Sequence, residues 1–106
     1  MARPDGVFAA LADPTRRYLL ERISGEGPLS ATELAADLPI SRQAVVKHLG
    51  ALGAAGLLRS QRRGREVLFT VDTASLRPAT DWLERIGRQW DDRLVALVKH
   101  LSPPEE

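Results

Sequence analysis

Four side chains that could contact the edges of DNA bases fall at helical spacing near the middle of the chain. They are Arg42, Gln43, Val46 and Lys47. Arginine, lysine and glutamine donate hydrogen bonds to purine edges in the major groove, and valine can contact the methyl group of thymine. No acid occurs between Asp37 and Glu66, whereas an ordinary solvated helix face mixes acids with bases. We therefore interpret these residues as the outer face of a DNA recognition helix.

The helix that presents this face is predicted within residues 40–58. Ser41 suits the N-cap position, because its hydroxyl can accept from a backbone N–H that the first turn leaves unpaired. Val45, Leu49 and Leu52 recur at steps of four and three, so they define a buried face. Gly56 suits the left-handed position that follows many helices.

Three shorter helices are predicted before it. Residues 6–12 predict one or two helical turns, and Asp13 can cap the next helix, with Pro14 harmless at its first position. The core face of that helix is expected to contain Tyr18, Leu19, Leu20 and Ile23. Ser30 and Glu33 then form a capping box. The short helix that follows is expected to bury Leu34, Ala35 and Leu38.

Pro39 should end this third helix and leave a turn of three or four residues before Ser41. Two helices joined in this way predict a helix-turn-helix. The alternative is an ordinary helical hairpin in a bundle, which the acid-free outer face disfavours.

A β-hairpin is predicted after the recognition helix, with strands at 57–62 and 66–71 and a tight turn at Gly64. Val67, Phe69 and Val71 alternate with Leu68 and Thr70, which predicts one buried face. The tip carries Arg62, Arg63 and Arg65. A helix-turn-helix followed by a hairpin is the winged-helix layout, and arginines on the wing would contact the DNA backbone or minor groove. Alternatively, the charged tip serves only solubility.

The last helix is predicted to begin between Leu76 and Pro78, with Ser75 as a candidate cap. It should run for about 36 Å, about the length of a whole domain of this size. The preceding elements are too small to cover its apolar stripe, so we expect a second copy of the chain to cover it. The predicted dimer interface contains Val7, Phe8, Leu11, Leu83, Ile86, Trp90, Leu94, Leu97 and Leu101. The predicted fold is mainly α with a small β-hairpin, a winged helix-turn-helix that dimerises through its first and last helices.

Composition sets the remaining expectations. The 106 residues predict one domain over 1–101 and a disordered tail over 102–106. The chain has no cysteine, which excludes disulfides and thiolate metal sites and fits a cytoplasmic protein. The net charge is only +1, yet residues 30–66 hold six bases against three acids and residues 72–106 hold five bases against seven acids. This asymmetry indicates one face for phosphates. Nothing in the sequence resembles a membrane span.

The sequence offers no candidates for catalysis, and we expect no metal or cofactor. His48 and His100 lie on different helices, so no two histidines have a ligating spacing. His48 is either a partly buried packing residue or a phosphate contact. Ser30, Thr32 and Ser41 could donate to phosphates from the starts of helices. Trp82 and Trp90 are interpreted as core, with a small-molecule pocket as the alternative.

Three segments together resemble the ArsR-type (arsenic-repressor-like) family of dimeric winged-helix transcription regulators. They are ALADPTRRYLLERI, LSATELAADLPISRQAVVKHLGALGAAGLL and RRGREVLFTV. The resemblance implies a homodimer that represses transcription from an inverted-repeat operator. It also implies DNA contacts from the outer face of the recognition helix and from the arginines of the wing.

The chain departs from the family's metal sensors. The helix before the turn carries Glu33-Leu-Ala-Ala-Asp37 where thiophilic-metal sensors have cysteines, and the last helix has only His100 as a histidine ligand. The resemblance therefore favours the metal-independent branch, whose members are often autoregulatory. Val46 stands where many relatives have a small hydroxylated residue. The alternatives are a ligand- or metal-responsive sensor on the same scaffold and a winged-helix module that binds protein.

Overall fold

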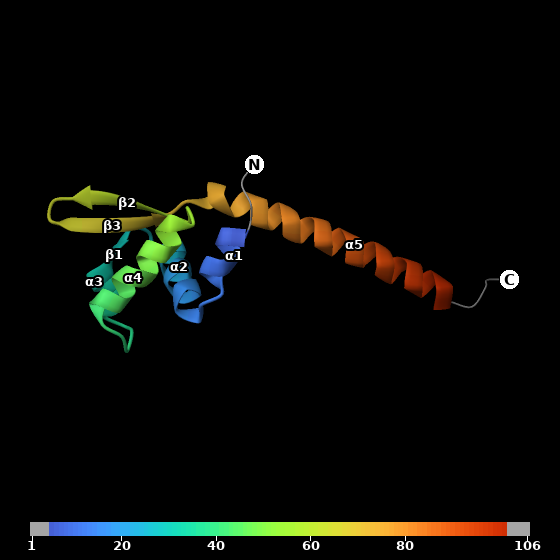
Figure 1. The fold of residues 1–106 in the computed structure, drawn as a ribbon, viewed down its shortest axis with the longest axis horizontal. Helices are drawn as coiled ribbons and strands as arrows, with labels where there is room; N and C mark the ends of the chain where they lie inside the picture. The colour runs from blue at the N-terminus through green and yellow to red at the C-terminus, as the bar shows by residue number, and fades with distance from the viewer. Residues whose placement is uncertain (1–4, 102–106) are drawn as a thin grey trace.

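The computed structural model describes residues 5–101, and of His100 and Leu101 only the backbone. The predicted tail at 102–106 and the predicted interface contact of Leu101 lie outside the described residues. The elements in chain order are α1 (Asp5–Leu11), α2 (Pro14–Glu26), β1 (Leu29–Ser30), α3 (Ala31–Ala35), α4 (Arg42–Ala54), β2 (Leu58–Arg63), β3 (Glu66–Val71), a 3-10 turn (Thr73–Leu76) and α5 (Arg77–Leu101). This is a mainly α winged helix-turn-helix with one small sheet (Figure 1).

Three of the predicted helix caps are present, those at Asp13, Ser30 and Ser41. The Asp13 carboxylate accepts from the backbone N–H groups of Thr15 and Arg16, at 2.7 and 3.2 Å, and begins α2. Ser30 and Glu33 form the reciprocal capping box of α3. The Ser41 hydroxyl accepts from Ala44 N at 3.1 Å and begins α4. Each bond satisfies a backbone donor that has no partner within the helix.

The core lies where α2, α3, α4 and the start of β2 meet. Its fully buried large side chains are Leu19, Ile23, Leu34, Val45, Leu49, Leu52 and Leu57. Leu20, Ala35 and Leu38 are only partly buried against it. The prediction for Tyr18 was wrong, because this residue is 37% exposed. It lies one position, about 100°, from Leu19 around α2, and neighbouring elements cover only one side of that helix.

The sheet contains three antiparallel strands in the order β1-β3-β2, so the predicted hairpin is extended by a strand that the sequence did not indicate. β1 has two residues, too few to show an alternating pattern, and it pairs Leu29 with Phe69. The wing turns at Gly64, whose φ of 63° is the left-handed conformation that a two-residue hairpin turn requires of its first residue.

Two expectations for the connections were wrong. α3 ends at Ala35, well before Pro39, because the chain turns at once, with Leu38 N donating to Ala35 O at 3.2 Å. The connection to α4 is therefore longer than three or four residues. Ser75 does not cap α5: the chain reaches this helix through the 3-10 turn, whose cap is Asp72. Ser75 instead packs against Gly56, where an added Cβ would lie 2.5 Å from Ser75 Oγ.

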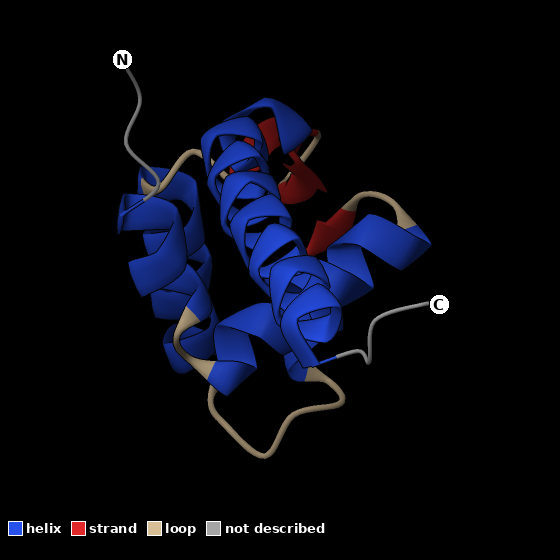
Figure 2. Ribbon diagram, turned by 90° about the vertical axis from the view of Figure 1, so that its right-hand side faces the viewer, coloured by secondary structure: helices blue, strands red, loops and turns tan. Residues whose placement is uncertain are grey.

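α5 begins at Arg77, within the predicted interval, and projects away from the remaining elements, which we call the head (Figure 1). The molecule measures 74 × 33 × 21 Å, and its radius of gyration is 19.6 Å, against about 13 Å for a compact chain of 100 residues. Figure 2, seen from the C-terminal end of α5, shows the helices of the head beside and behind this long helix. No helix among residues 5–101 is long and apolar enough to cross a membrane.

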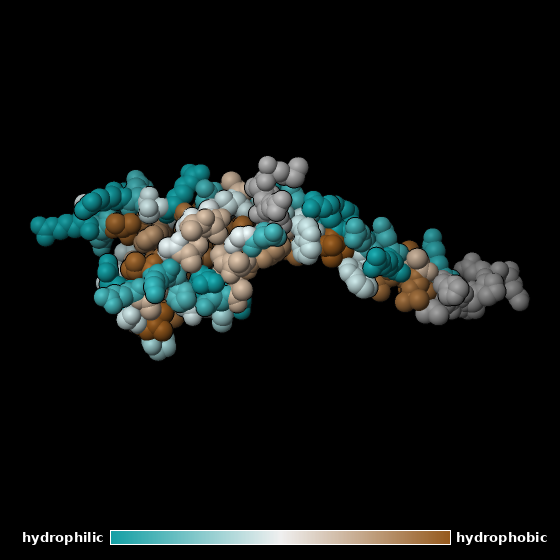
Figure 3. Space-filling model, in the orientation of Figure 1, coloured by the Kyte–Doolittle hydropathy of each residue, from teal (hydrophilic) through white to brown (hydrophobic). Residues whose placement is uncertain are grey.

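The apolar stripe of α5 is covered only where the helix starts. Ala79 is buried and Ile86 is half-buried, whereas Leu83, Trp90, Leu94 and Leu97 are each more than half exposed. Figure 3 shows hydrophobic residues along the projecting part of the helix. Val7, predicted to lie in the dimer interface, is instead buried in the core of its own chain and has no surface left for a partner.

Candidate nucleic-acid interface

The two faces of α4 separate cleanly by polarity. Val45, Leu49 and Leu52 point into the core, at 1% exposure or less. The predicted DNA-contacting residues of this helix and its cap are all exposed; they are Ser41, Arg42, Gln43, Val46 and Lys47. α4 packs on α1, α2, α3 and β2, and its outer face is open along its first turns. The structure thus brings these five predicted residues together on one surface.

The wing presents a second cationic group. Arg62 and Arg63 end β2 and Arg65 lies in the turn, and all three are exposed. In the part of the chain that the structure describes, none of the three forms an ion pair, whereas Arg59 at the base of the wing is bound to Asp72 at 3.0 Å. The charge at the tip is therefore free to bind an external anion.

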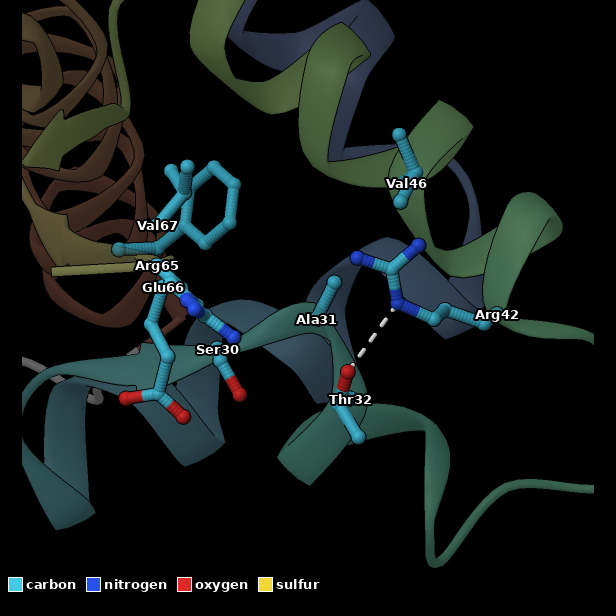
Figure 4. Close-up of a pocket in the computed structure, with 9 residues that line it drawn as sticks. Ser30, Ala31, Thr32, Arg42, Val46, Arg65, Glu66 and Val67 are labelled. Carbon is cyan, nitrogen blue, oxygen red and sulfur yellow. Dashed lines mark hydrogen bonds between the residues drawn. The ribbon is translucent and has the colours of Figure 1, made fainter. Parts of the chain in front are cut away.

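A cleft of about 300 Å³ separates α4 from the wing (Figure 4). Its lining comes from the start of α3, the start of α4, the turn of the wing and the first residues of β3; the residues are Ser30, Ala31, Thr32, Arg42, Val46, Arg65, Glu66, Val67 and Phe69. Sequence reasoning missed Ala31, Glu66, Val67 and Phe69 as parts of this surface. The alternation along β3 did place Val67 and Phe69 on one side of the strand.

Val67 corrects a prediction. It was expected to be buried with Phe69 and Val71, yet it is 44% exposed, and the other two are only half-buried. The wing extends past the end of the core, so the far half of its inner face has nothing to cover it. That half forms one wall of the cleft instead.

Thr32 and Arg42 are joined across the start of the helix-turn-helix. Arg42 Nε donates to Thr32 Oγ1 at 3.1 Å, and both side chains are exposed. Figure 4 shows the two terminal nitrogens of Arg42 on the side of the guanidinium turned away from Thr32, toward Val46.

Two predicted phosphate contacts are less accessible than the outer face of α4. Ser30 is 6% exposed and its hydroxyl accepts from Glu33 N at 3.1 Å, so it presents little surface to a phosphate. His48 is half-buried. The pKa of the Asp13 carboxyl is lowered chiefly by the backbone N–H of Arg16, with a smaller contribution from the nearby His48. This position favours the packing interpretation of His48.

The acids near the connection between α3 and α4 either have hydrogen-bond or ion-pair partners already or lie at the edge of the cationic surface. Asp37 pairs with Arg22, whose Nη1 lies 3.1 Å from Asp37 Oδ2, and Arg22 Nε also pairs with Glu26 at 2.8 Å. Among residues 5–99, no three histidine or acidic side chains are gathered as a metal ion would require. The arrangement as a whole is an open, cationic and partly apolar surface. Its chemistry fits binding to phosphates and base edges.

Comparison with known proteins finds helix-turn-helix transcription regulators. A family model described as a helix-turn-helix domain matches residues 11–61. The HTH-type transcriptional regulator Rv2034 of Mycobacterium tuberculosis is 42% identical over 82 residues, 77% of this chain and 76% of that protein. The transcriptional repressor SdpR of Bacillus subtilis is 29% identical over 90 residues, 85% of this chain and 99% of the repressor. A solved ArsR-like transcriptional regulator from Rhodococcus sp. RHA1 superposes with a TM-score of 0.75 at 43% identity, covering 94% of this chain and 93% of that one.

Proposed function

Because this chain belongs to the ArsR-type family of winged helix-turn-helix transcription regulators, we propose that it is a homodimeric repressor that binds an inverted-repeat operator. Its relatives are transcriptional regulators, a class of proteins that are not enzymes. SdpR is a repressor, and we extend repression to this chain. It acts in the cytoplasm and binds an operator near its own gene or a neighbouring one.

The observation that carries the proposal is the exposed outer face of α4. It presents Arg42, Gln43 and Lys47 without any acid on the same helix. The arginine-tipped wing lies across the cleft from it. In this arrangement α4 enters the major groove, where arginine, lysine and glutamine read base edges. Arg62, Arg63 and Arg65 contact the flanking backbone, and Thr32 and Ser41 donate to phosphates near the helix starts.

The dimer is supported by the α5 stripe. Leu83, Trp90, Leu94 and Leu97 lie exposed on a helix of 25 residues. Stable exposure of such a stripe is costly, and a second copy of the same helix covers it through a twofold axis. Phe8 and Leu11 of α1 lie partly buried next to the core and extend the same surface. A twofold dimer sets the half-sites about one helical turn, near 10 base pairs, apart.

We place the chain in the metal-independent branch, which is supported by the complete lack of cysteine. The competing function is a metal-responsive sensor. Titration calorimetry of the full chain with Zn²⁺, Ni²⁺ and Cd²⁺ should give no stoichiometric heat. Tight binding of one ion per protomer would replace our assignment with the sensor.

Selection of duplexes from a random pool tests the proposal directly. The full chain should enrich an inverted repeat, and Arg42→Ala and Lys47→Ala should each weaken binding to it about tenfold or more. Arg85→Ala and Lys99→Ala, which truncate exposed bases on α5, serve as matched controls and should bind normally. Wild-type affinity of both α4 variants would remove the assignment of the recognition helix. Negligible affinity for any duplex at low salt would favour a protein-binding module.

A further inference from the structure

The hydrogen bond between Arg42 and Thr32 uses one specific donor of the guanidinium. It is Nε that lies 3.1 Å from Thr32 Oγ1, and this bond crosses from α3 to the first residue of α4. An arginine offers donors along two edges, one with Nε and a terminal nitrogen and one with both terminal nitrogens. Thr32 occupies the first edge. The second edge remains available.

The free edge has a defined direction. Figure 4 shows both terminal nitrogens of Arg42 turned away from Thr32 and lying below Val46 in the cleft. Within residues 5–101 neither of them donates a hydrogen bond. A guanidinium held at Nε loses less conformational freedom when its two terminal N–H groups bind a ligand, because its orientation is already restricted.

We propose that Thr32 is a positioning residue that fixes Arg42 to read one guanine in each half-site, through donation to guanine O6 and N7. This inference rests on the proposed function, since it assumes that α4 lies in the major groove. Guanine is the base whose major-groove edge offers two adjacent acceptors, and arginine in bidentate contact with them is the commonest specific contact.

The surroundings of the free edge favour a base over a phosphate. Arg42 is the first residue of α4, and the N-terminal residues of a recognition helix are those that approach base edges. Val46 and Val67, each 44% exposed, line the same cleft. These apolar side chains suit a thymine methyl group better than a hydrated phosphate.

The first step of the test asks whether Arg42 contacts the N7 atom of a guanine. On the duplex selected by the wild-type chain, each guanine is replaced in turn by 7-deazaguanine, which lacks N7. We expect one guanine per half-site at which this change weakens wild-type binding about tenfold. The same change should have little effect on Arg42→Ala, which has already lost the contact.

Three variants of threonine then test the positioning role. Thr32→Val, which keeps the shape and removes the hydroxyl, should lower the preference for guanine over adenine at that position about fivefold, the effect of one hydrogen bond. Thr32→Ser should retain the preference. Thr80→Val, which removes the hydroxyl that donates to Arg77 O on α5, is the matched control and should also retain it. Melting temperatures check that all variants fold, and Thr32→Ala replaces Thr32→Val if that variant does not.

The outcomes are distinguishable. If Thr32→Val weakens binding equally for all sequences, Thr32 is only a phosphate contact and the proposal fails. If no 7-deazaguanine weakens wild-type binding, and a neutral methylphosphonate linkage weakens the wild type but not Arg42→Ala, then Arg42 contacts a phosphate and the proposal fails as well. In both cases an enriched inverted repeat leaves the proposed function standing. If no sequence is enriched, both proposals fall together.

Discussion

The ring of Trp82 on α5 meets the ring of Phe8 on α1 edge to face, with centroids 5.4 Å apart and an interplanar angle of 67°. This contact lies where the long helix leaves the head: Ala79, one turn earlier, is buried, and Leu83, one residue later, is 53% exposed. Phe8 and Trp82 therefore join α1 to the part of α5 that leaves the head. They also join the two helices that we propose to form the dimer interface.

The first prediction concerns this aromatic pair. Edge-to-face pairs contribute about 0.5–1.5 kcal/mol beyond the burial of their area. The variants Phe8→Leu, Trp82→Leu and the double variant should therefore show a coupling of that size in urea unfolding at one fixed protein concentration. Phe8→Leu combined with Phe69→Leu, on β3, should be additive and serves as the control. Additivity of the Phe8 and Trp82 variants would show that the contact adds nothing beyond area.

The second prediction compares two neighbouring residues of α5. Leu94 and Val95 are equally exposed in the single chain, at 54% and 55%, but the helical repeat turns Val95 about 100° away from Leu94, outside the stripe that contains it. Leu94→Asp should convert the dimer to a monomer in sedimentation velocity without unfolding the head. Val95→Asp should leave the dimer intact. A dimer that survives Leu94→Asp would exclude the α5 stripe as the interface.

The third prediction concerns the wing. Arg63→Ala should weaken binding to all duplexes alike, because a backbone contact carries no sequence information. The plot of log affinity against log salt concentration should lose about one unit of slope, as expected for one released counterion. Arg85→Ala, which truncates an exposed arginine on α5, should leave the slope unchanged. An unchanged slope for Arg63→Ala would place the tip of the wing away from the DNA.

The fourth prediction concerns acid. Hydrogen bonds lower the pKa values of three carboxyls: the backbone N–H of Arg16 acts on Asp13, the side chain of Arg22 on Glu26, and the side chain of Arg59 on Asp72. A carboxyl with a lowered pKa stabilises the fold fully above its unfolded pKa of about 4 and loses this effect as the pH falls through the folded value. The melting temperature should therefore be flat from pH 8 to 5 and fall below about pH 4.

Asp72→Asn checks this origin. It removes the charge that pairs with Arg59 but keeps an oxygen able to accept from Ala74 N. The melting temperature of this variant should depend less steeply on pH below about pH 4 than that of the wild type. Asp92→Asn, at an exposed acid on α5, should match the wild type. Equal slopes for Asp72→Asn and the wild type would show that this pair does not contribute to acid sensitivity.

Local rules determined much of this molecule from the sequence. Caps at Asp13, Ser30 and Ser41 were predictable because each depends on hydrogen bonds to residues two or three positions away. The buried face of α4 and the start of α5 were predictable for the same reason, since helical periodicity is a local property. One predicted boundary was wrong: α3 ends at Ala35 and not at Pro39.

Tertiary structure decided what the local rules could not. Strand β1 forms only because Leu29 pairs with Phe69, forty residues later in the chain. Val67 is exposed where the sequence predicted burial, and Val7 is buried in its own core where the sequence predicted a dimer contact. The exposure of a side chain depends on which elements lie near it and not on its spacing in the sequence. The bond from Arg42 to Thr32 is likewise a product of the packing of α4 on α3. The sequence by itself determined that a basic outer face would exist. Only the folded arrangement decided which edge of Arg42 that face presents, because a guanidinium acquires a direction from the group that holds it.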